Sequence, residues 1–225
     1  MGRKRITKKQ LKEDAFVSTA FEASHYIQEN LTSIILSIVG VIALAGVVFL
    51  FINYRTQQAN ESALAMFKAD GLYMNGQYAL AAADFEKVAE DFSGSTVANK
   101  AVFFAGDSYY KAGEYEQALA RFEQCREELS GDDPLMVNCL VGLAASYEGL
   151  ENLEKAIELY REAIQAAEYD FQKIEISRTL SIALEAAGKN REAVETLDRI
   201  IQDYPDNSFS GEITELRAEF AAKTR

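Results

Sequence analysis

The sequence predicts an all-α chain in which a single transmembrane helix precedes an α-solenoid of about four helix pairs and a C-terminal capping helix. Three observations predict this class. An uncharged apolar run lies near the N-terminus, the remainder repeats every 37 or 38 residues, and only two prolines interrupt stretches rich in Ala, Glu and Leu, which favour helix over strand. The expected divisions are a basic tail (1–29), the transmembrane helix (30–54), the repeats (55–207) and the capping helix (208–225).

The apolar run is long enough to span a bilayer. Residues 30–54 contain no charged side chain, and a helix of about 20 residues crosses the ~30 Å hydrocarbon core. The run lacks the polar stripe of a buried soluble helix. A cleaved signal peptide is disfavoured because over thirty residues precede the almost wholly apolar centre of the run, which begins at Ile34, and no small-x-small site follows the run. N-myristoylation is disfavoured because Ile6 stands where Ser or Thr is required. We therefore expect an uncleaved anchor, closed at the interface by Tyr54 and Arg55.

Positive charge near the two ends of the run predicts its orientation. Beyond the run, the nearest basic residues are Arg55 and Lys68. Before it, six basic residues lie within the first twelve: Arg3, Lys4, Arg5, Lys8, Lys9 and Lys12. Because flanks rich in Lys and Arg stay in the cytoplasm, we expect a cytoplasmic N-terminus and an exported C-terminal domain. Thr7–Gln10 fits a helix capping box. The tail is then either a helix on the anionic inner leaflet or a solvated segment that only sets orientation.

Charge and cysteine content disfavour several classes of function. From Arg55 onward 31 acidic residues face 17 basic ones, which disfavours nucleic-acid binding because phosphate contacts need Lys and Arg. The only histidine, His25, lies in the tail, so Cys125 and Cys139 lack the further ligands that a zinc site needs. We interpret the two cysteines as small buried thiols, with a disulfide in an oxidising compartment as the alternative. No metal or cofactor is expected.

An internal repeat organises the exported part. Four alanines recur at steps of 37, 38 and 37 residues, and each is followed four residues later by a large side chain. The alanine lets two helices approach closely, and the large residue fills the space beside it. The alanines are Ala81, Ala118, Ala156 and Ala193, and their partners are Phe85, Phe122, Tyr160 and Leu197.

Each unit is expected to hold two helices. In the second unit a helix over 98–112 stops at Gly113, and a return helix covers 115–129. In the third unit Asp133 and Pro134 are suited to start a helix as its cap and first turn. After the last unit, a helix from about residue 208 carries one apolar stripe that would close the open end of a solenoid, made of Phe209, Ile213, Leu216 and Phe220.

The repeat resembles the tetratricopeptide repeat over about residues 60–207. Gly-x-Tyr-x-x-Ala occurs at 76–81 and at 113–118, followed in each case by the large aromatic residue of the second helix, and Gly106, Tyr109 and Tyr110 match the preceding helix. The third and fourth units match less closely, because Glu151 replaces the turn glycine and Asn190 replaces the tyrosine.

The layout of tail, anchor and repeats also resembles the YfgM-like ancillary subunits of the SecYEG translocon, and the opening segment 5–14 is similar to their tails. This resemblance implies a bacterial inner-membrane protein with a cytoplasmic N-terminus and periplasmic repeats. The segment 204–208 also resembles repeat ends in periplasmic envelope-assembly proteins. The leading hypothesis is therefore an ancillary or chaperone-like subunit of the translocon, and the alternative is an envelope-assembly or cell-division adaptor.

No constellation for catalysis is recognisable in the exported part. It has no histidine for a Ser–His or Cys–His pair and no glycine-rich phosphate loop. We expect a binding module without a small-molecule substrate, whose partners are translocon subunits, exported chains or periplasmic chaperones.

Solenoids of this kind bind on a concave surface lined by the first helices of their units. The resemblance places that surface at Met66, Asp70, Tyr73, Phe103, Asp107, Tyr110, Val141, Ile182 and Glu185. Interleaved apolar and acidic groups suit a peptide with apolar and basic residues; the alternative is that several of these aromatic residues are core. Asp70 and Asp107 stand where the asparagines of a carboxylate clamp are expected, which disfavours a chaperone's C-terminal carboxylates as ligand.

Overall fold

The structure, a computed structural model, describes residues 8–129 and 133–224. The regular elements of these residues are all α-helices, as predicted. The chain divides into two units after Gln58. The helices are α1 (Lys8–Met74), α2 (Tyr78–Asp91), α3 (Thr96–Ala112), α4 (Tyr115–Glu128), α5 (Leu135–Gly149), α6 (Leu153–Ala166), α7 (Asp170–Ala186), α8 (Asn190–Asp203) and α9 (Ser210–Ala222).

The apolar run lies within α1. Both prolines of the chain lie beyond residue 130, so no residue of α1 lacks the backbone N–H that helix hydrogen bonds need. Among the described residues, one segment is long and apolar enough to cross a membrane, Ile35–Met74, and none of its most apolar stretch is buried. The tail is helical from Lys8 onward, whereas Thr7 of the expected capping box lies outside the described residues. The helix continues through residues 54 and 55, the predicted end of the transmembrane segment, to Met74.

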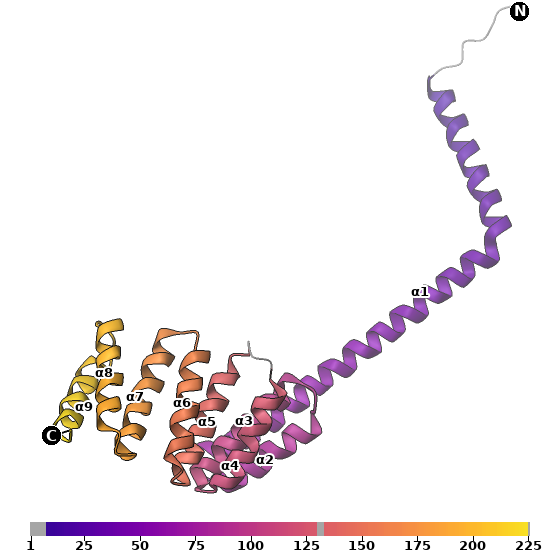
Figure 1. Cartoon of the computed structure of the whole chain (residues 1–225). Helices are drawn as coiled ribbons and strands as arrows, with labels where there is room; N and C mark the ends of the chain where they lie inside the picture. Colours follow the sequence, from indigo (N-terminus) through magenta and orange to yellow (C-terminus); the bar gives the residue numbers. More distant parts are fainter. Residues whose placement is uncertain (1–7, 130–132, 225) are drawn as a thin grey trace, which may run out of the picture. The chain divides into compact units, whose positions relative to one another are not determined.

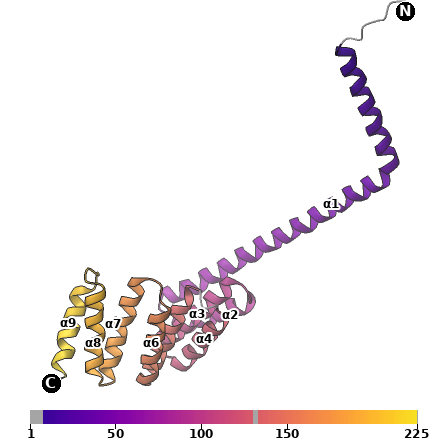
Figure 2. The same cartoon turned by 45° about the horizontal axis from the view of Figure 1, so that its top comes forward.

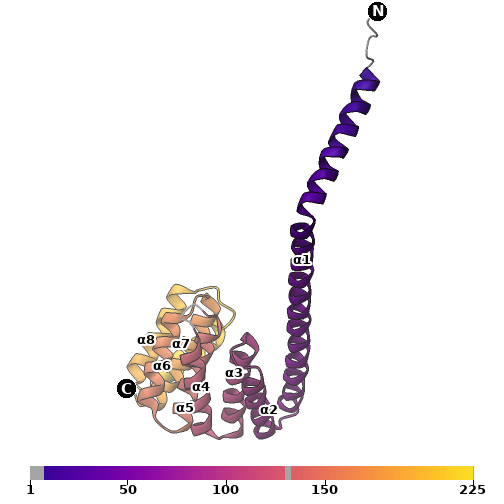
Figure 3. The ribbon, with the colours of Figure 1, turned by 90° about the vertical axis from the view of Figure 1, so that its right-hand side faces the viewer.

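The second unit, Ala59–Arg225, contains the predicted helix pairs. The end of α1 pairs with α2 through a shared buried cluster that includes Ala69, Ala81 and Phe85. The pairs α3–α4, α5–α6 and α7–α8 follow, and from α2 to α9 each helix packs on the next in chain order. Figures 1 and 2 show the later helices of this unit standing side by side, and Figure 3 views the row of pairs end-on. The first helix α3 also contacts the next first helix, α5.

The four turns within the helix pairs share one backbone conformation. A positive φ occurs at Gly76 (73°), Gly113 (79°), Glu151 (60°) and Gly188 (73°). In every turn, the next residue donates its N–H to the carbonyl oxygen five residues earlier, as Gln77 does to Leu72 at 3.0 Å and as Glu114, Asn152 and Lys189 do in the later turns. This hydrogen bond is that of a Schellman helix end. Glu151 therefore adopts a left-handed conformation that glycine adopts at lower cost.

The predicted alanines and large residues form the core. All four alanines are fully buried, and the four large partners expose at most 2% of their surface. The Phe122 ring is seated against two glycines, since a Cβ added to Gly106 or Gly142 would approach the ring to 2.9 Å or 2.5 Å. The close approach of α3 and α5 to α4 thus depends on missing side chains at two positions.

The cysteines are buried, as expected, but they are not free thiols. Cys125 on α4 and Cys139 on α5 form a disulfide with a Cα–Cα distance of 6.1 Å. The favoured interpretation of two separate thiols is therefore wrong, because helix packing brings together side chains that are fourteen residues apart. The next helix begins as expected near Asp133, whose carboxylate accepts the Leu135 N–H at 2.9 Å.

The last helix, α9, closes the C-terminal end of the stack. It begins at Ser210, two residues later than expected. Ile213 and Phe220 of the predicted stripe are buried, while Phe209 and Leu216 pack partly buried against the same core. Ion pairs of 2.7 Å and 2.8 Å join Glu212 to Arg178 and Arg217 to Asp198.

Candidate functional site

Three rows of side chains run across the first helices of the four pairs. The turn residues of the four pairs are Gly76, Gly113, Glu151 and Gly188. The residues three, six and ten places before each of them occupy equivalent positions in every unit. We call these twelve residues the first-helix surface. All are half-buried except Ile182, which is 37% exposed. The rows are Tyr73, Tyr110, Glu148 and Glu185; Asp70, Asp107, Ala145 and Ile182; and Met66, Phe103, Val141 and Arg178.

All nine residues nominated from the sequence belong to this surface. Three members were missed, namely Ala145, Glu148 and Arg178. The signal that identifies them is the turn position, because a residue at a fixed distance before the helix-ending residue occupies the same helix face in each unit. The third turn is less evident in sequence because its residue is Glu151 rather than glycine.

An aromatic and ionic cluster occupies the N-terminal part of the surface. The Tyr73 hydroxyl on α1 donates a hydrogen bond to the Asp107 carboxylate on α3. Lys111, one turn further along α3, lies 3.8 Å from the same carboxylate, and its Nζ is 4.9 Å from the centre of the Tyr73 ring. Tyr78 completes the cluster with its ring 5.5 Å from that of Tyr73. The cluster therefore fixes α3 against the first pair while leaving aromatic faces partly exposed.

The cluster perturbs the acidities of its members. Burial, followed by the hydrogen bond to Asp107, raises the pKa of Tyr73 above its usual 10.0. The hydrogen-bonding contact with Tyr73 raises the pKa of Lys111 above 10.5. Both groups are already protonated at neutral pH, and the upward shifts extend to higher pH the range in which the phenol is neutral and the ammonium is charged.

Two of the nominated aromatic residues contribute to packing as well as to the surface. The Phe103 ring lies 5.3 Å from Phe104 and 5.8 Å from Phe122. The Tyr110 ring lies 5.7 Å from Tyr115 on α4. Because both rings pack partly buried against the main core cluster, the interpretation of these residues as core applies to much of each side chain. Their remaining exposed edges belong to the first-helix surface.

Carboxylates in the C-terminal part of the surface are held by neighbouring groups. The Glu148 carboxylate accepts a hydrogen bond of 3.0 Å from the Tyr160 hydroxyl. The Glu185 carboxylate lies 2.8 Å from Lys223 of α9. Among residues 8–129 and 133–224, no side chain forms a hydrogen bond or an ion pair with the Asp70 carboxylate. Asp70 is thus the carboxylate of the surface that is available to pair with a partner's charge, and Ile182 is the most exposed member of the surface.

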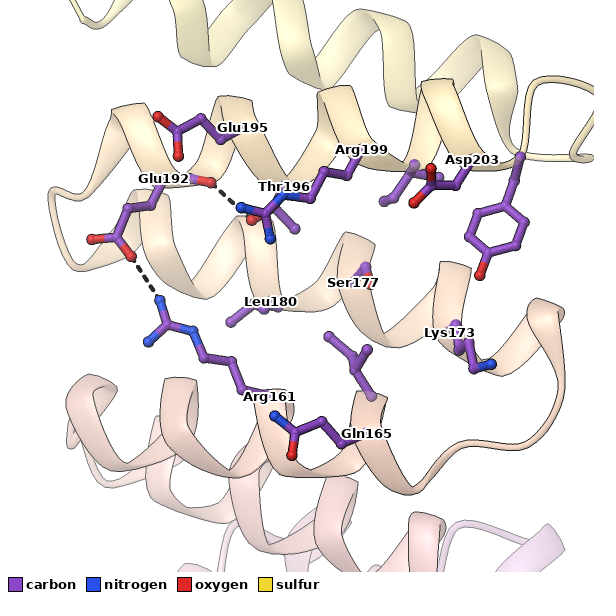
Figure 4. A pocket seen from close by; sticks show the side chains of 13 residues that line it. Arg161, Gln165, Lys173, Ser177, Leu180, Glu192, Glu195, Thr196, Arg199 and Asp203 are labelled. Carbon is purple, nitrogen blue, oxygen red and sulfur yellow. Dashed lines mark hydrogen bonds and ion pairs between the residues drawn. The ribbon is translucent and has the colours of Figure 1, made fainter.

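A separate groove of about 380 Å³ lies among the second helices α6 and α8 and the first helix α7 (Figure 4). Its lining balances three basic side chains against three acidic ones. Figure 4 shows Arg161 of α6 reaching Glu192 of α8, a contact of 2.6 Å. The basic members are Arg161, Lys173 and Arg199, and the acidic members are Glu192, Glu195 and Asp203. This balance gives the groove no strong preference for a charged ligand.

The arrangement suits binding of a chain across several helices. Within the part of the molecule that the structure describes, no group of three His, Cys, Asp or Glu side chains is placed to hold a metal ion. The first-helix surface instead combines apolar edges with carboxylates over four units, which is the kind of surface that recognises an extended or helical segment.

Comparisons with known proteins agree with the fold. Two family models, each described as tetratricopeptide repeat, match residues 96–169 and 180–207. The chain contains tetratricopeptide repeats. Its long apolar helix precedes the repeats, which form a scaffold for protein–protein interactions, a family role that is typically non-enzymatic. No curated protein matches the chain.

Solved structures that match this chain share the fold of its repeats at low sequence identity. The putative kinesin light chain nearly identical TPR-like repeats of Podosopora anserina match with a TM-score of 0.62 and 18% identity, covering 72% of this chain and 85% of that chain. BtubC (BKLC) from P. vanneervenii matches with a TM-score of 0.61 and 11% identity, covering 69% and 70%. MamA from Desulfovibrio magneticus RS-1 matches with a TM-score of 0.55 and 21% identity, covering 65% and 78%. At identities this low, the matches show a shared fold, and the partners of this chain have to be inferred from its own residues.

Proposed function

We propose that the protein is a membrane-anchored scaffold whose first-helix surface binds polypeptides outside the cytoplasm, as an ancillary or chaperone-like subunit of the inner-membrane translocon. Tetratricopeptide repeats bind proteins, and the proposal assigns this chain a place and a class of partner. The observation that carries it is the first-helix surface, to which each of the four units contributes one carboxylate beside aromatic or aliphatic side chains. Such a surface complements a segment with basic and apolar residues.

The apolar part of α1 supports the anchored location. The exposed large apolar side chains there show about half or more of their surface, including Phe49 at 69%, Leu50 at 67% and Val41 at 67%. Water would penalise this exposure, whereas lipid tails would not. The six basic residues before the run favour a cytoplasmic N-terminus.

The disulfide supports an exported repeat domain. Structural disulfides persist in oxidising compartments and are rare in the cytoplasm. The pair formed by Cys125 and Cys139 belongs to the second unit, which is the part that the charge rule places outside. Protease added to spheroplasts should therefore digest residues 59–225 and spare the tail. Protection of the repeats would contradict this orientation.

Affinity capture from solubilised membranes tests the partner. We expect the full chain to recover translocon subunits or exported chains, and we expect Asp70→Lys to reduce recovery because it reverses a carboxylate on the first-helix surface. Asp84→Lys makes the same change at an exposed position of α2 and should recover the partners normally. Recovery of envelope-assembly or cell-division components without any translocon subunit would favour the alternative adaptor role.

A further inference from the structure

The first helix pair has a face that every later pair buries. Two positions of the first helix, twelve and five residues before the turn residue, are at most 6% exposed in the second, third and fourth units. The earlier position holds Ala101, Cys139 and Ile176, and the later position holds Ser108, Ser146 and Ala183. In those units the preceding pair covers them. In the first unit the same positions hold Leu64 and Gly71, which are exposed.

These two residues belong to a longer apolar stripe on the end of α1. Leu64, Phe67, Gly71 and Met74 follow one another at intervals of three, four and three residues, and we call them the N-terminal stripe. Leu64 is 57% exposed, Phe67 is 73% exposed and Met74 is 81% exposed, and nothing lies within 4 Å of a Cβ built on Gly71. The spacing is that of the contacting a and d positions of a coiled coil.

Lys68 indicates what kind of element covers the stripe. It stands eight residues before the turn, where the later units bury Ala105, Leu143 and Leu180. A complete helix pair stacked on this face would bury the ammonium group of Lys68, at a high cost in solvation. A single helix along the stripe leaves Lys68 at the flank, where its charge stays in water while its stem packs.

We propose that the N-terminal stripe is the contact between two copies of this chain, with the ends of their α1 helices packed in parallel. The direction rests on the proposed anchoring, because two chains held by the same segment in one membrane run in the same sense through α1. In a parallel pair each position meets itself. The Phe67 layer is then followed by the Gly71 layer, which leaves space for the two rings. Confinement to one membrane raises the effective concentration of the second copy.

Cysteine cross-linking of the full chain in native membranes tests the pairing. The native cysteines are buried in a disulfide, so a single introduced cysteine reports alone. We expect Leu64→Cys and Met74→Cys each to give a disulfide-linked homodimer on mild oxidation. Phe67→Glu in the Leu64→Cys chain would place a carboxylate of each copy in the apolar contact, which is costly. We expect the amount of cross-linked dimer to fall about tenfold or more, which corresponds to about 1.4 kcal/mol or more. Phe171→Glu, the same change at a 62% exposed position of α7, should leave the dimer intact.

Three outcomes would overturn the proposal. The first is that neither cysteine variant gives a homodimer. The second is that a dimer forms only when the Leu64→Cys and Met74→Cys chains are co-expressed, which would indicate an antiparallel pair. The third is that the introduced cysteines link only to a different protein. Failure here is distinguishable from failure of the proposed function, because protease accessibility of the repeats and capture of partners through the first-helix surface do not depend on α1 pairing.

Discussion

Replacing Gly142 with alanine tests how tightly the aromatic residue of a second helix fixes its neighbours. The methyl group would come within 2.5 Å of the Cε1 and Cζ atoms of Phe122, and the ring is 98% buried and cannot swing into solvent. An unobstructed Gly→Ala change in a helix stabilises by about 1 kcal/mol. Overpacking a buried site costs about 1–3 kcal/mol. Because an approach of 2.5 Å to a buried ring places the cost at the upper end of that range, we expect Gly142→Ala to lower the free energy of unfolding by about 2 kcal/mol.

Matched variants isolate the contact with the ring. Gly106→Ala places its methyl group 2.9 Å from the ring of Phe122 and should cost less than Gly142→Ala. Gly211→Ala, with no atom within 4 Å, should be neutral or stabilising by up to about 1 kcal/mol. Phe122→Leu should cost less in the Gly142→Ala background than alone, because the smaller side chain makes room for the methyl group.

Urea unfolding of the full chain in detergent, followed by circular dichroism, gives these free energies. The reasoning would be refuted if Gly142→Ala proved as stable as the parent chain, or if Gly142→Ala and Gly211→Ala changed stability equally.

Three further predictions concern the turns, the disulfide and the core tyrosine. Glu151→Gly should raise the free energy of unfolding by about 1 kcal/mol, because a φ of 60° is costly for a residue with a Cβ. Gly113→Ala should lower the free energy of unfolding for the same reason. Urea midpoints that move in the opposite directions would count against the shared turn conformation. Replacing both Cys125 and Cys139 with alanine should lower the free energy of unfolding by about 3 kcal/mol, the value expected for a closed loop of about 15 residues. An unchanged melting temperature in non-reducing buffer would contradict a stabilising disulfide. Burial, together with the Glu148 carboxylate, raises the pKa of Tyr160 far above 10.0, so stability present below pH 10 should fall as the pH rises further, because the unfolded chain loses the phenol proton first. Melting curves above pH 10 should show a shallower fall for Tyr160→Phe than for the parent chain.

Sequence alone was sufficient for the repeat architecture because its determinants are local. The left-handed turns select glycine, and the recurring alanine and large residue occupy one helix face at fixed spacing. These features located the helix pairs and the buried Phe122, and even the weaker third unit keeps its turn at Glu151. The same logic placed Phe209 and Phe220 against the core through α9.

The remaining features depend on distances between helices, which periodicity does not give. Cys125 and Cys139 pair because helices α4 and α5 pack against each other. The contact of Tyr73 with Asp107 joins residues 34 apart through the approach of α3 to the first pair. The nominated binding residues came from the resemblance to the tetratricopeptide repeat, but the depth of Phe103 in the packing follows from how closely successive helices approach each other.

Photo-cross-linking in living cells tests the central claim most directly. A photoreactive residue at position 182, on the first-helix surface, should capture exported chains or translocon subunits, with the captured protein identified by mass spectrometry. The same residue at position 158, an exposed position on the second helix α6, should capture them at most weakly. Equal capture from positions 182 and 158, or capture of cytoplasmic proteins at position 182, would contradict the account.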